Sequence, residues 1–320
     1  MAVYTEVSDE DLKTFVAEYD LGGVVAFKGI AEGVENSNYL LNMEAATYIL
    51  TLYEKRVARE DLPFFLALME HLAGQGVPCP RPIHGKDGKV MRNLCGKPAA
   101  IISFLQGMWP RRVLPDHCRL LGQAIAAMHL AGESFAQSRP NALGLEGWER
   151  LFQACAEKAD EVRPGLAAEI RGELDSLAKD WPKNLPKGII HADLFPDNVF
   201  FLGNELSGLI DFYFACNDFF AYELAICLNA WCFETDGGFN ITNAGHLIAA
   251  YRAVRPLQEE EIAALPALAR GAAMRFLLTR LYDWLNQADG ALVRPKNPLE
   301  FLQRLRFHKG IESPTAYGIV

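Results

Sequence analysis

One stretch of the chain, residues 189–214, constrains the fold more than any other part of the sequence. It reads IIHADLFPDNVFFLGNELSGLIDFYF. Two acids and one amide, Asp193, Asn198 and Asp211, stand between short apolar runs, and the runs GII, NVFF and GLID are typical of buried strands. The stretch therefore predicts short buried strands whose connections carry these polar side chains.

The spacing of the polar residues is typical of one kind of chemistry. His191, Asp193 and Asn198 are arranged H-x-D-x-x-x-x-N, as in the catalytic loop of protein kinases, with Ala192 where an arginine usually stands. Asp211 stands thirteen residues beyond Asn198 and is followed by a phenylalanine, where such kinases have a metal-binding Asp-Phe-Gly.

Phosphoryl transfer explains both spacings, because it needs little covalent help and depends mainly on positioning and charge stabilisation. A carboxylate must orient the attacking hydroxyl and accept its proton, and Asp193 is the candidate for this base. An amide oxygen and a second carboxylate must hold magnesium against the triphosphate of ATP, and Asn198 and Asp211 are the candidates for these ligands. We therefore expect ATP and Mg²⁺ as cofactors.

The same residues also have a plain structural interpretation. Pro196, Asp197 and Asn198 could form an ordinary turn between two strands. Each polar residue taken alone would more often be structural than catalytic, but the joint spacing is far less expected by chance. A metal site built on His191 is a weaker alternative, because no second His or Cys stands at ligand spacing.

Composition and charge exclude several classes of protein. The chain has 320 residues, of which 50% are hydrophobic and 22% charged, enough to form one or two domains with a sizeable core. A net charge of -9 argues against nucleic acid or an anionic membrane as a partner. Seven cysteines without a C-x-x-C pattern indicate reduced thiols. No signal peptide is indicated and no apolar run approaches the ~20 residues that span a bilayer, so we expect a soluble, cytoplasmic protein. The oligomeric state stays open.

The first part of the chain predicts a helix followed by an antiparallel meander. Ser8 and the three acids after it are typical of a helix start, and the helix should end near Tyr19. We expect strands over 24–28, 38–43 and 47–53, a helix over 60–73, and an apolar strand over 99–105.

From Pro115 onward the sequence favours helices. They are expected over 116–135, 148–158, 166–177, 222–233, 246–254 and 259–286, with Pro266 dividing or kinking the last one. Strands first and helices later predict an α+β fold with a small antiparallel-sheet lobe at 1–104, which would bind the nucleotide. A larger, mainly helical lobe at 105–320 would hold the catalytic loop and the acceptor site, with a cleft between the lobes.

Two segments of the first lobe are candidates for contacts with ATP. The loop 29–37 could cover the phosphates with backbone N–H groups, and Gly33, Asn36 and Ser37 are its candidate residues. The loop lacks a G-x-G-x-x-G pattern, so a plain hairpin loop is the competing interpretation. The end of the strand 99–105, with Ser103 and Leu105, is placed like a hinge whose backbone could bind an adenine edge.

These residues together resemble a known family. HADLFPDN, LIDF, and GQGVPCPRPI ahead of an apolar strand resemble the aminoglycoside phosphotransferase and choline kinase superfamily. Three further stretches are similar to the homoserine kinases of that superfamily, namely GIAEGVENSNYLL, TLYEKRVAREDLPFFLALMEHLAGQGVPCPRPI and RGAAMRFLLTRLYDWLN. The likeness covers nearly the whole chain. It implies a two-lobed protein-kinase-like fold and ATP-dependent phosphorylation of the side-chain hydroxyl of L-homoserine, a step of threonine biosynthesis.

The resemblance also implies roles for residues of this chain. Asp193 matches the catalytic base, Asn198 and Asp211 match the magnesium ligands, and His191 matches the residue that supports the catalytic loop. The chain departs from the kinase pattern at the phosphate-binding lysine, which usually stands in the third strand and pairs with a helix glutamate.

Thr51 stands at the position of that lysine. Lys55 follows on the same face of the strand but about 13 Å further along, at ~3.3 Å per residue. Either Lys55 folds back towards the phosphates, with Glu60 or Glu70 as its partner, or the phosphates are held in another way. An exposed charge at the end of the strand is the equal alternative for Lys55.

The segment 273–286 is the candidate site for the amino-acid acceptor. It is strongly apolar yet carries Arg275, Arg280 and Asp283, and buried charges are costly unless they are paired or used. An arginine could hold the carboxylate of homoserine through its planar fork while Asp283 meets the ammonium group. The competing interpretation is an internal ion pair, since Arg280 and Asp283 are three residues apart.

Other functions stay open at this point. The acceptor could be an aminoglycoside, choline, methylthioribose or another alcohol, and Tyr222, Trp231 and Phe233 could form an aromatic cage for a quaternary ammonium group. If the amino-acid site lies elsewhere, Asn229, Trp231 and Glu234 are the next candidates. A kinase-like regulator without activity is disfavoured, because all three polar residues of the motif are present.

Overall fold

The computed structural model describes residues 5–30, 36–54, 58–287 and 295–319. The chain forms two compact units. The first comprises the residues up to Gly107 together with Ser207–Tyr213, and the second comprises Met108–Leu206 and Phe214–Val320. The lobe boundary expected after residue 104 stays a prediction.

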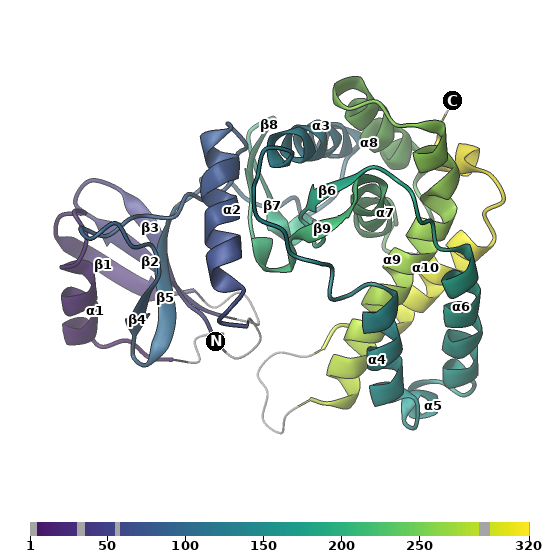
Figure 1. The fold of residues 1–320 in the computed structure, drawn as a ribbon, viewed down its shortest axis with the longest axis horizontal. Coiled ribbons are helices and arrows are strands. Elements are labelled where there is room, and N and C mark those ends of the chain that lie inside the picture. Colours follow the sequence, from purple (N-terminus) through teal and green to yellow (C-terminus); the bar gives the residue numbers. More distant parts are fainter. Residues whose placement is uncertain (1–4, 31–35, 55–57, 288–294, 320) are drawn as a thin grey trace. The chain divides into compact units, whose positions relative to one another are not determined.

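The first unit is built around an antiparallel sheet of five strands in the order β1-β2-β3-β5-β4 (Figure 1). Its elements are α1 (Asp9–Val16), β1 (Val24–Gly29), β2 (Ser37–Met43), β3 (Thr47–Leu52), α2 (Leu62–Gly74), β4 (Arg92–Leu94) and β5 (Lys97–Ser103). The meander and both helices were expected from the sequence, whereas β4 was not. Ser8 caps α1 by accepting the N–H of Asp11 at 3.1 Å, and the helix ends at Val16, earlier than predicted.

Alternation along the strands decides which face of this sheet is covered. In β2, Tyr39, Leu41 and Met43 point to one face, where they join Leu12 and Phe15 of α1 in a core cluster. Figure 1 shows α1 on this side of the sheet and α2 on the other. Register is fixed because a slip of one residue would move these side chains to the opposite face.

The second unit is mainly helical. Its elements are α3 (Pro115–Gly132), α4 (Leu145–Cys155), α5 (Ala159–Val162), α6 (Leu166–Asp180), β6 (Lys187–Ile190), the 3₁₀ turn η1 (Pro196–Asn198), β7 (Val199–Leu202), β9 (Cys216–Phe219), α7 (Phe220–Trp231), α8 (Ile241–Val254), α9 (Glu259–Leu285), α10 (Leu299–Lys309) and η3 (Pro314–Tyr317). β6 pairs antiparallel with β9, which the sequence did not predict, and β7 pairs with β8 (Glu205–Leu209). A second 3₁₀ turn, η2 (Phe212–Phe214), follows β8. The predicted α+β fold class is therefore confirmed.

Helix α9 is the central element of the second unit and packs against α4, α6, α7 and α10. It continues unbroken through Pro266, so the expected division into two helices is wrong. A proline removes one backbone donor and crowds the preceding turn. Burial of Leu265, Leu268 and Ala269, none of which is exposed, keeps the helix together around it.

Two glycines let helices of this unit approach closely. A Cβ at Gly122 of α3 would lie 2.2 Å from the backbone oxygen of Leu247 in α8. A Cβ at Gly271 of α9 would lie 2.2 Å from the ring of Trp181. Both distances are far shorter than a van der Waals contact, so a larger residue at either position would clash with its neighbour and force the two elements apart.

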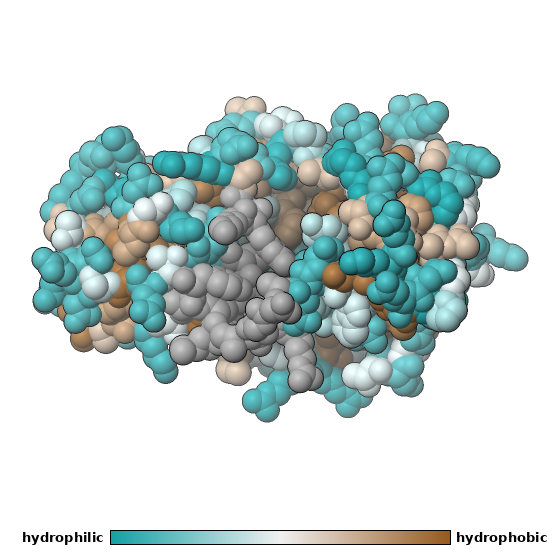
Figure 2. All heavy atoms as spheres, turned by 90° about the horizontal axis from the view of Figure 1, so that it is seen from below, coloured by the Kyte–Doolittle hydropathy of each residue, from teal (hydrophilic) through white to brown (hydrophobic). Residues whose placement is uncertain are grey.

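Hydrophilic side chains cover most of the face shown in Figure 2. All seven cysteines are free thiols, and Cys95 alone among them is exposed, as expected for reduced cysteines. Within the described part of the chain, α9 is the one helix long and apolar enough to cross a membrane, which the sequence interpretation overlooked. Because 61% of its most apolar window is buried inside the protein, its apolarity serves the core.

Candidate active site

The predicted catalytic loop connects β6 to β7. Its turn is closed by backbone hydrogen bonds, from the N–H of Phe195 to the carbonyl of Asp193 at 2.8 Å and from the N–H of Asn198 to the carbonyl of Phe195 at 2.9 Å. The Asn198 side-chain NH₂ donates to the carbonyl of Asp193 at 2.8 Å and to its Oδ2 at 3.3 Å. The structure thus brings Asp193 and Asn198 together, as their spacing predicted.

His191 supports this loop from inside. Its side chain is fully buried, and its Nδ1 accepts the backbone N–H of Asp193 at 3.3 Å. Ala192, between them, has a φ of 64°, in the left-handed region that residues with a Cβ rarely adopt. A backbone held there needs strong support from its surroundings.

That support comes from Glu223 of α7, a residue that sequence reasoning missed. Its fully buried carboxylate accepts the backbone N–H groups of His191 and Ala192, and both of its oxygens lie 3.1 Å from the Ala192 nitrogen. Burial alone would raise the pKa of Glu223. The neighbouring His129, the charge of His191 and the N–H of Ala192 outweigh it and hold the pKa below its usual value.

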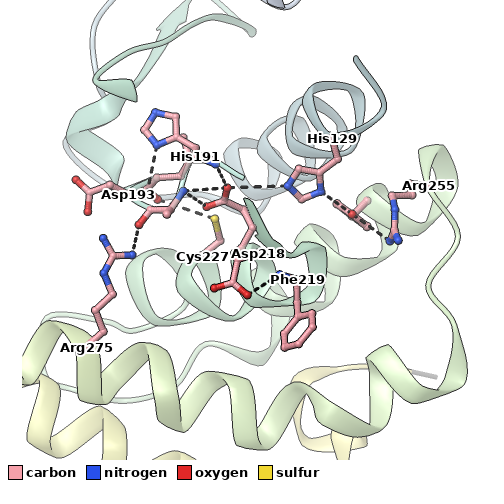
Figure 3. Close-up of polar contacts among 12 residues, drawn as sticks. His129, His191, Asp193, Asp218, Phe219, Cys227, Arg255 and Arg275 are labelled. Atoms are coloured by element: carbon pink, nitrogen blue, oxygen red, sulfur yellow. Dashed lines mark hydrogen bonds and ion pairs between the residues drawn. The ribbon is translucent and has the colours of Figure 1, made fainter. Parts of the chain in front are cut away.

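A chain of polar side chains leads away from Glu223 (Figure 3). His129 of α3 lies with Nε2 3.9 Å from a Glu223 oxygen, and its Nδ1 lies 2.8 Å from the hydroxyl of Tyr251. Arg255 donates to that hydroxyl at 3.3 Å and to Glu261 at 3.0 Å. Burial lowers the pKa of His129, although Glu223 opposes the shift. The only available sequence signal was polar residues at apolar helix positions.

Arg275 of α9 holds the loop from the other side. Its guanidinium donates to the carbonyl of Ala192, and its side chain is 1% exposed (Figure 3). The same guanidinium lies 4.6 Å from the ring centroid of Phe276 and 5.5 Å from that of Phe214. Ala192 is thus held at its N–H by Glu223 and at its carbonyl by Arg275.

Arg280 lies five residues further along α9. It forms an ion pair with Glu300 of α10 at 2.7 Å and lies 4.4 Å from the ring centroid of Phe301. Burial lowers the pKa of Arg280, while the hydrogen bond and charge of Glu300 and the charges of Asp197 and Asp193 in the catalytic loop oppose the shift. Asp283 is half-buried on the same helix.

The next candidates, in α7 and just after it, are structural in their described contacts. Asn229 donates to the carbonyls of Ala225 and Ala269 at 3.0 Å each, and the indole N–H of Trp231 donates to the carbonyl of Leu194 at 2.7 Å. Glu234 is exposed and accepts from Asn240 at 2.7 Å. Tyr222 and Trp231, two members of the aromatic cage considered above, are core residues with at most 1% exposure.

The residues that the sequence proposed for contacts with ATP lie in the first unit. Gly33 and Lys55 fall outside the described residues. Asn36 and Ser37 are buried and hold the chain after β3, because Asn36 Oδ1 accepts the N–H of Glu54 at 3.3 Å and Ser37 donates to the Glu54 carboxylate at 2.8 Å. Glu54 also pairs with Lys97 of β5 at 3.0 Å, a pair that the sequence did not suggest.

The structure also shows the surroundings of the other residues proposed near ATP. The hydroxyl of Ser103 accepts the N–H of Arg81 at 2.9 Å, and a Cβ on Gly208 would lie 2.7 Å from the side chain of Leu105. Thr51 is buried and donates to Asn38 at 2.8 Å. Among the two glutamates proposed to pair with Lys55, Glu60 is exposed and Glu70 lies 2.7 Å from His84.

Asp211 follows β8 and is also part of the first unit. Its φ is 67°, again in the left-handed region, so the backbone aims this carboxylate by an unusual turn. The hydroxyls of Tyr53 and Tyr213 lie 3.2 Å apart close to it. Burial raises the pKa of Tyr53 to about 12, with the charge of Asp211 adding to the effect.

The donor atoms fit a hard cation such as magnesium only in part. Asn198 uses its NH₂ group as a donor, which leaves its Oδ1 for a cation. Within the described ranges, no group of three or more His, Cys, Asp and Glu side chains could hold a metal ion. An amide oxygen and one carboxylate suffice only where phosphate oxygens and water complete the shell, which is the usual arrangement for magnesium in kinases.

Solved structures with the same fold are phosphotransferases of small molecules. An amicoumacin kinase in complex with AMP-PNP aligns with a TM-score of 0.70 at 17% identity, covering 97% of this chain and 94% of its own. A spectinomycin phosphotransferase in complex with ADP aligns with a TM-score of 0.66 at 14% identity and 98% coverage of both chains. A choline kinase from Cryptosporidium parvum aligns with a TM-score of 0.65 at 14% identity, covering 89% and 88%. These likenesses establish the kinase-like fold.

Sequence comparison is more specific. Residues 26–257 match the family model of the phosphotransferase enzyme family. The homoserine kinase of Rhodospirillum rubrum is 60% identical over 319 residues, and that of Rhizobium rhizogenes is 61% identical over 319 residues. Each alignment covers 100% of this chain and 99% of the relative. The chain is therefore an ATP-using kinase that belongs to the phosphotransferase enzyme family and, within it, to the homoserine kinases.

Proposed function

We propose that this kinase transfers the γ-phosphoryl group of ATP to the side-chain hydroxyl of L-homoserine, which forms O-phospho-L-homoserine and ADP in threonine biosynthesis. The observation that carries the acceptor is the identity of about 60% along the whole chain to homoserine kinases. In the reaction, the hydroxyl oxygen forms a bond to the γ-phosphorus. The bond from that phosphorus to the bridging oxygen breaks, and ADP leaves with its electron pair.

Asp193 is the proposed base. Its carboxylate lies on a turn whose backbone is held by His191, Glu223 and Arg275, so its position is set by buried groups. In this role it orients the acceptor hydroxyl and takes its proton as the new bond forms. His191, as a positioning residue, acts through the backbone N–H of Asp193.

Asn198 and Asp211 are the proposed ligands of Mg²⁺, which would neutralise charge on the phosphates when bound. Asn198 would offer its Oδ1 and Asp211 its carboxylate. For ATP itself, the loop with Gly33, Asn36 and Ser37, the residue Lys55, and Ser103 with Leu105 remain the proposed contacts. The burial of Asn36 and Ser37 favours contact through their backbone over contact through their side chains.

The acceptor is proposed to bind at Arg280 and Asp283, with its carboxylate at the arginine and its ammonium group at the aspartate. Arg280 and Asp283 lie three residues apart on α9, and the charges of Asp193 and Asp197 act on Arg280, which supports this assignment. Arg275 we assign to the loop, because its guanidinium is buried against the Ala192 carbonyl.

The charges near the loop disfavour the cationic acceptors among the alternatives. Aminoglycosides and choline are cations and bind best to acidic or aromatic sites. Arg280 and Arg304 instead lie against the ring of Phe301, which is 6.1 Å from that of Phe195 in the catalytic loop, and two aromatic side chains that could enclose choline are buried in the core.

The decisive test is release of ADP from ATP and magnesium with purified enzyme and each acceptor in turn. L-Homoserine should be the preferred acceptor, and choline, methylthioribose and a representative aminoglycoside should give kcat/KM values lower by orders of magnitude. Equal or better turnover of one of these would overturn the assignment of the acceptor. ATP binding without turnover of any acceptor would favour a regulator.

A further inference from the structure

Two arginines share one aromatic ring beside the catalytic loop. The Phe301 ring centroid lies 4.4 Å from the guanidinium carbon of Arg280 and 4.5 Å from that of Arg304. Phe301 is fully buried, and Phe195 of the catalytic loop lies 6.1 Å from it, centroid to centroid. The ring thus brings the two guanidinium groups to one aromatic side chain, which is itself a neighbour of Phe195 in the catalytic loop.

The two cations have one carboxylate between them. Arg280 pairs with Glu300 at 2.7 Å, whereas Arg304 has no ion-pair partner within the described ranges. The one hydrogen bond of Arg304 there goes to the backbone carbonyl of Asn229 at 2.6 Å. A guanidinium has five N–H donors, so the described residues engage only a small part of the donor capacity of Arg304.

Electrostatics make this arrangement costly without an anion. Burial, together with the charge of Arg280, lowers the pKa of Arg304 to about 10. Like charges brought together away from water repel each other unless a counter-ion lies between them. The stacking on Phe301 and the Asn229 carbonyl offset part of this cost, and an anion would offset more.

Glu300 indicates which anion fits. Its carboxylate reaches Arg280 from a side chain that is 53% exposed, so it lies at the solvent edge and can be displaced. It shows that a carboxylate can approach this pair. All three residues, Arg280, Glu300 and Arg304, lie beyond residue 257, where the match to the general phosphotransferase family ends.

We propose that Arg280 and Arg304 together hold the carboxylate of the amino-acid acceptor, and that Glu300 occupies this place in the free enzyme. The proposal rests on the proposed function and adds Arg304 as its specificity-determining residue. When the acceptor binds, its carboxylate takes the place of the Glu300 carboxylate at Arg280 and pairs with the unused donors of Arg304. Selection for an α-amino acid over a simple amino alcohol then comes from this site.

The test compares two acceptors in the same preparation. L-Homoserine carries the carboxylate, and 3-aminopropan-1-ol is the same molecule without it. In Arg304→Gln, kcat/KM for L-homoserine should fall about 10- to 100-fold, the range for losing a hydrogen-bonded charge contact. For 3-aminopropan-1-ol, kcat/KM and the KM for ATP should stay near the unsubstituted values. Because both acceptors share one preparation, loss of folded protein cancels in their ratio.

Arg306→Gln is the matched control. It removes an arginine from the same helix, two residues on, where the side chain is exposed and pairs with Glu169 at 2.6 Å. The ratio of the two acceptors should not change in this variant. Calorimetric binding of L-homoserine to Arg304→Gln gives a second measurement that does not depend on turnover, and its dissociation constant should rise by a similar factor.

Glu300→Gln separates the parts of the proposal. Removing the internal carboxylate should lower the KM for L-homoserine several-fold and leave 3-aminopropan-1-ol unaffected. A higher KM for both acceptors would instead indicate that Glu300 binds the ammonium group. It would overturn the proposal that Glu300 occupies the carboxylate site in the free enzyme.

The remaining outcomes distinguish this proposal from the proposed function. An unchanged acceptor ratio in Arg304→Gln, with L-homoserine turned over by the unsubstituted enzyme, overturns the carboxylate site alone. A raised KM for ATP would mean that the arginines serve phosphate, which also overturns it. No turnover of L-homoserine by the unsubstituted enzyme overturns the function and the site together.

Discussion

Both carboxylate oxygens of Glu223 lie 3.1 Å from the backbone nitrogen of Ala192, 31 residues away in sequence, and Ala192 has a left-handed backbone. The contact fixes the peptide between His191 and Ala192, which is one peptide before the one that joins Ala192 to Asp193. In this way a buried acid of α7 sets the direction of a carboxylate that it does not touch.

Glu223→Gln should therefore lower kcat with little change in the KM for ATP. The glutamine NH₂ cannot accept an N–H, so one buried donor of the loop loses its partner at a cost of ~1–3 kcal/mol. We expect a fall in kcat of about 10- to 100-fold, to be measured by ADP release. Glu146→Gln, at an exposed position of α4, is the control. Wild-type kcat in a folded Glu223→Gln would show that the loop does not depend on this contact.

Asp193→Ala should abolish most turnover while ATP binding and folding persist. General-base catalysis typically contributes ~10²–10⁴-fold, so kcat should fall by that factor. Asp197→Ala is a close control, since Asp197 lies in the same turn but is 53% exposed and pairs with Lys296 at 3.4 Å. Comparable losses in both variants would mean that the turn, and not the base, had been damaged.

Asn198→Ala and Asp211→Ala should raise the magnesium concentration needed for half-maximal rate. The effect should be larger for Asp211, because a carboxylate brings a full negative charge to the cation. Magnesium titrations at saturating ATP measure it. An unchanged requirement in both variants would remove both residues from the metal site.

His308 should make the protein less stable in mild acid. It is fully buried with Nδ1 2.9 Å from the hydroxyl of Tyr317, and burial, together with the charge of Arg304, lowers its pKa to about 3. The unfolded chain, with an ordinary histidine pKa near 6.5, binds the proton first, so stability falls as pH drops from about 6.5 towards 3.

Between pH 7 and pH 5 this single group should cost about 2 kcal/mol of unfolding free energy. Urea denaturation at the two pH values measures the loss, and His308→Gln should reduce it. The exposed His246 provides the control His246→Gln, which should leave the pH dependence as it was. The same loss in all three proteins would exclude His308 as its source.

The fold could be predicted where local pattern decides structure. A strand was expected over 38–43, where the structure has β2, and the cap at Ser8 indicated the start of α1. Pro266 misled the prediction, because its local effect on the helix is outweighed by burial on several sides of α9. Strand β4, with three residues, was too short to show a period.

The candidate site could be predicted only where its residues are neighbours in sequence. The closeness of Asp193 and Asn198 followed from their spacing. Glu223 and Arg304 could not be found in this way, because their importance comes from partners in distant segments and from burial that sequence does not reveal. Glu223 is a charged residue in the largely apolar helix α7, and that contrast was its only signal, whereas Arg304 is one of several charged residues of α10.

The unbroken course of α9 sets a fixed length between two of its arginines. Arg275 holds the carbonyl next to Asp193, and Arg280, five residues on, lies about 7.5 Å further along the axis at ~1.5 Å per residue. Because the rise per residue of a helix is fixed, the spacing of the two arginines is fixed too. The enzyme should therefore select acceptors by the distance between their carboxylate and their hydroxyl group. L-Serine, one methylene shorter, and 5-hydroxy-L-norvaline, one longer, should each show kcat/KM reduced by about 10- to 100-fold relative to L-homoserine. Equal kcat/KM values for all three acceptors would mean that α9 does not determine the chain length of the acceptor.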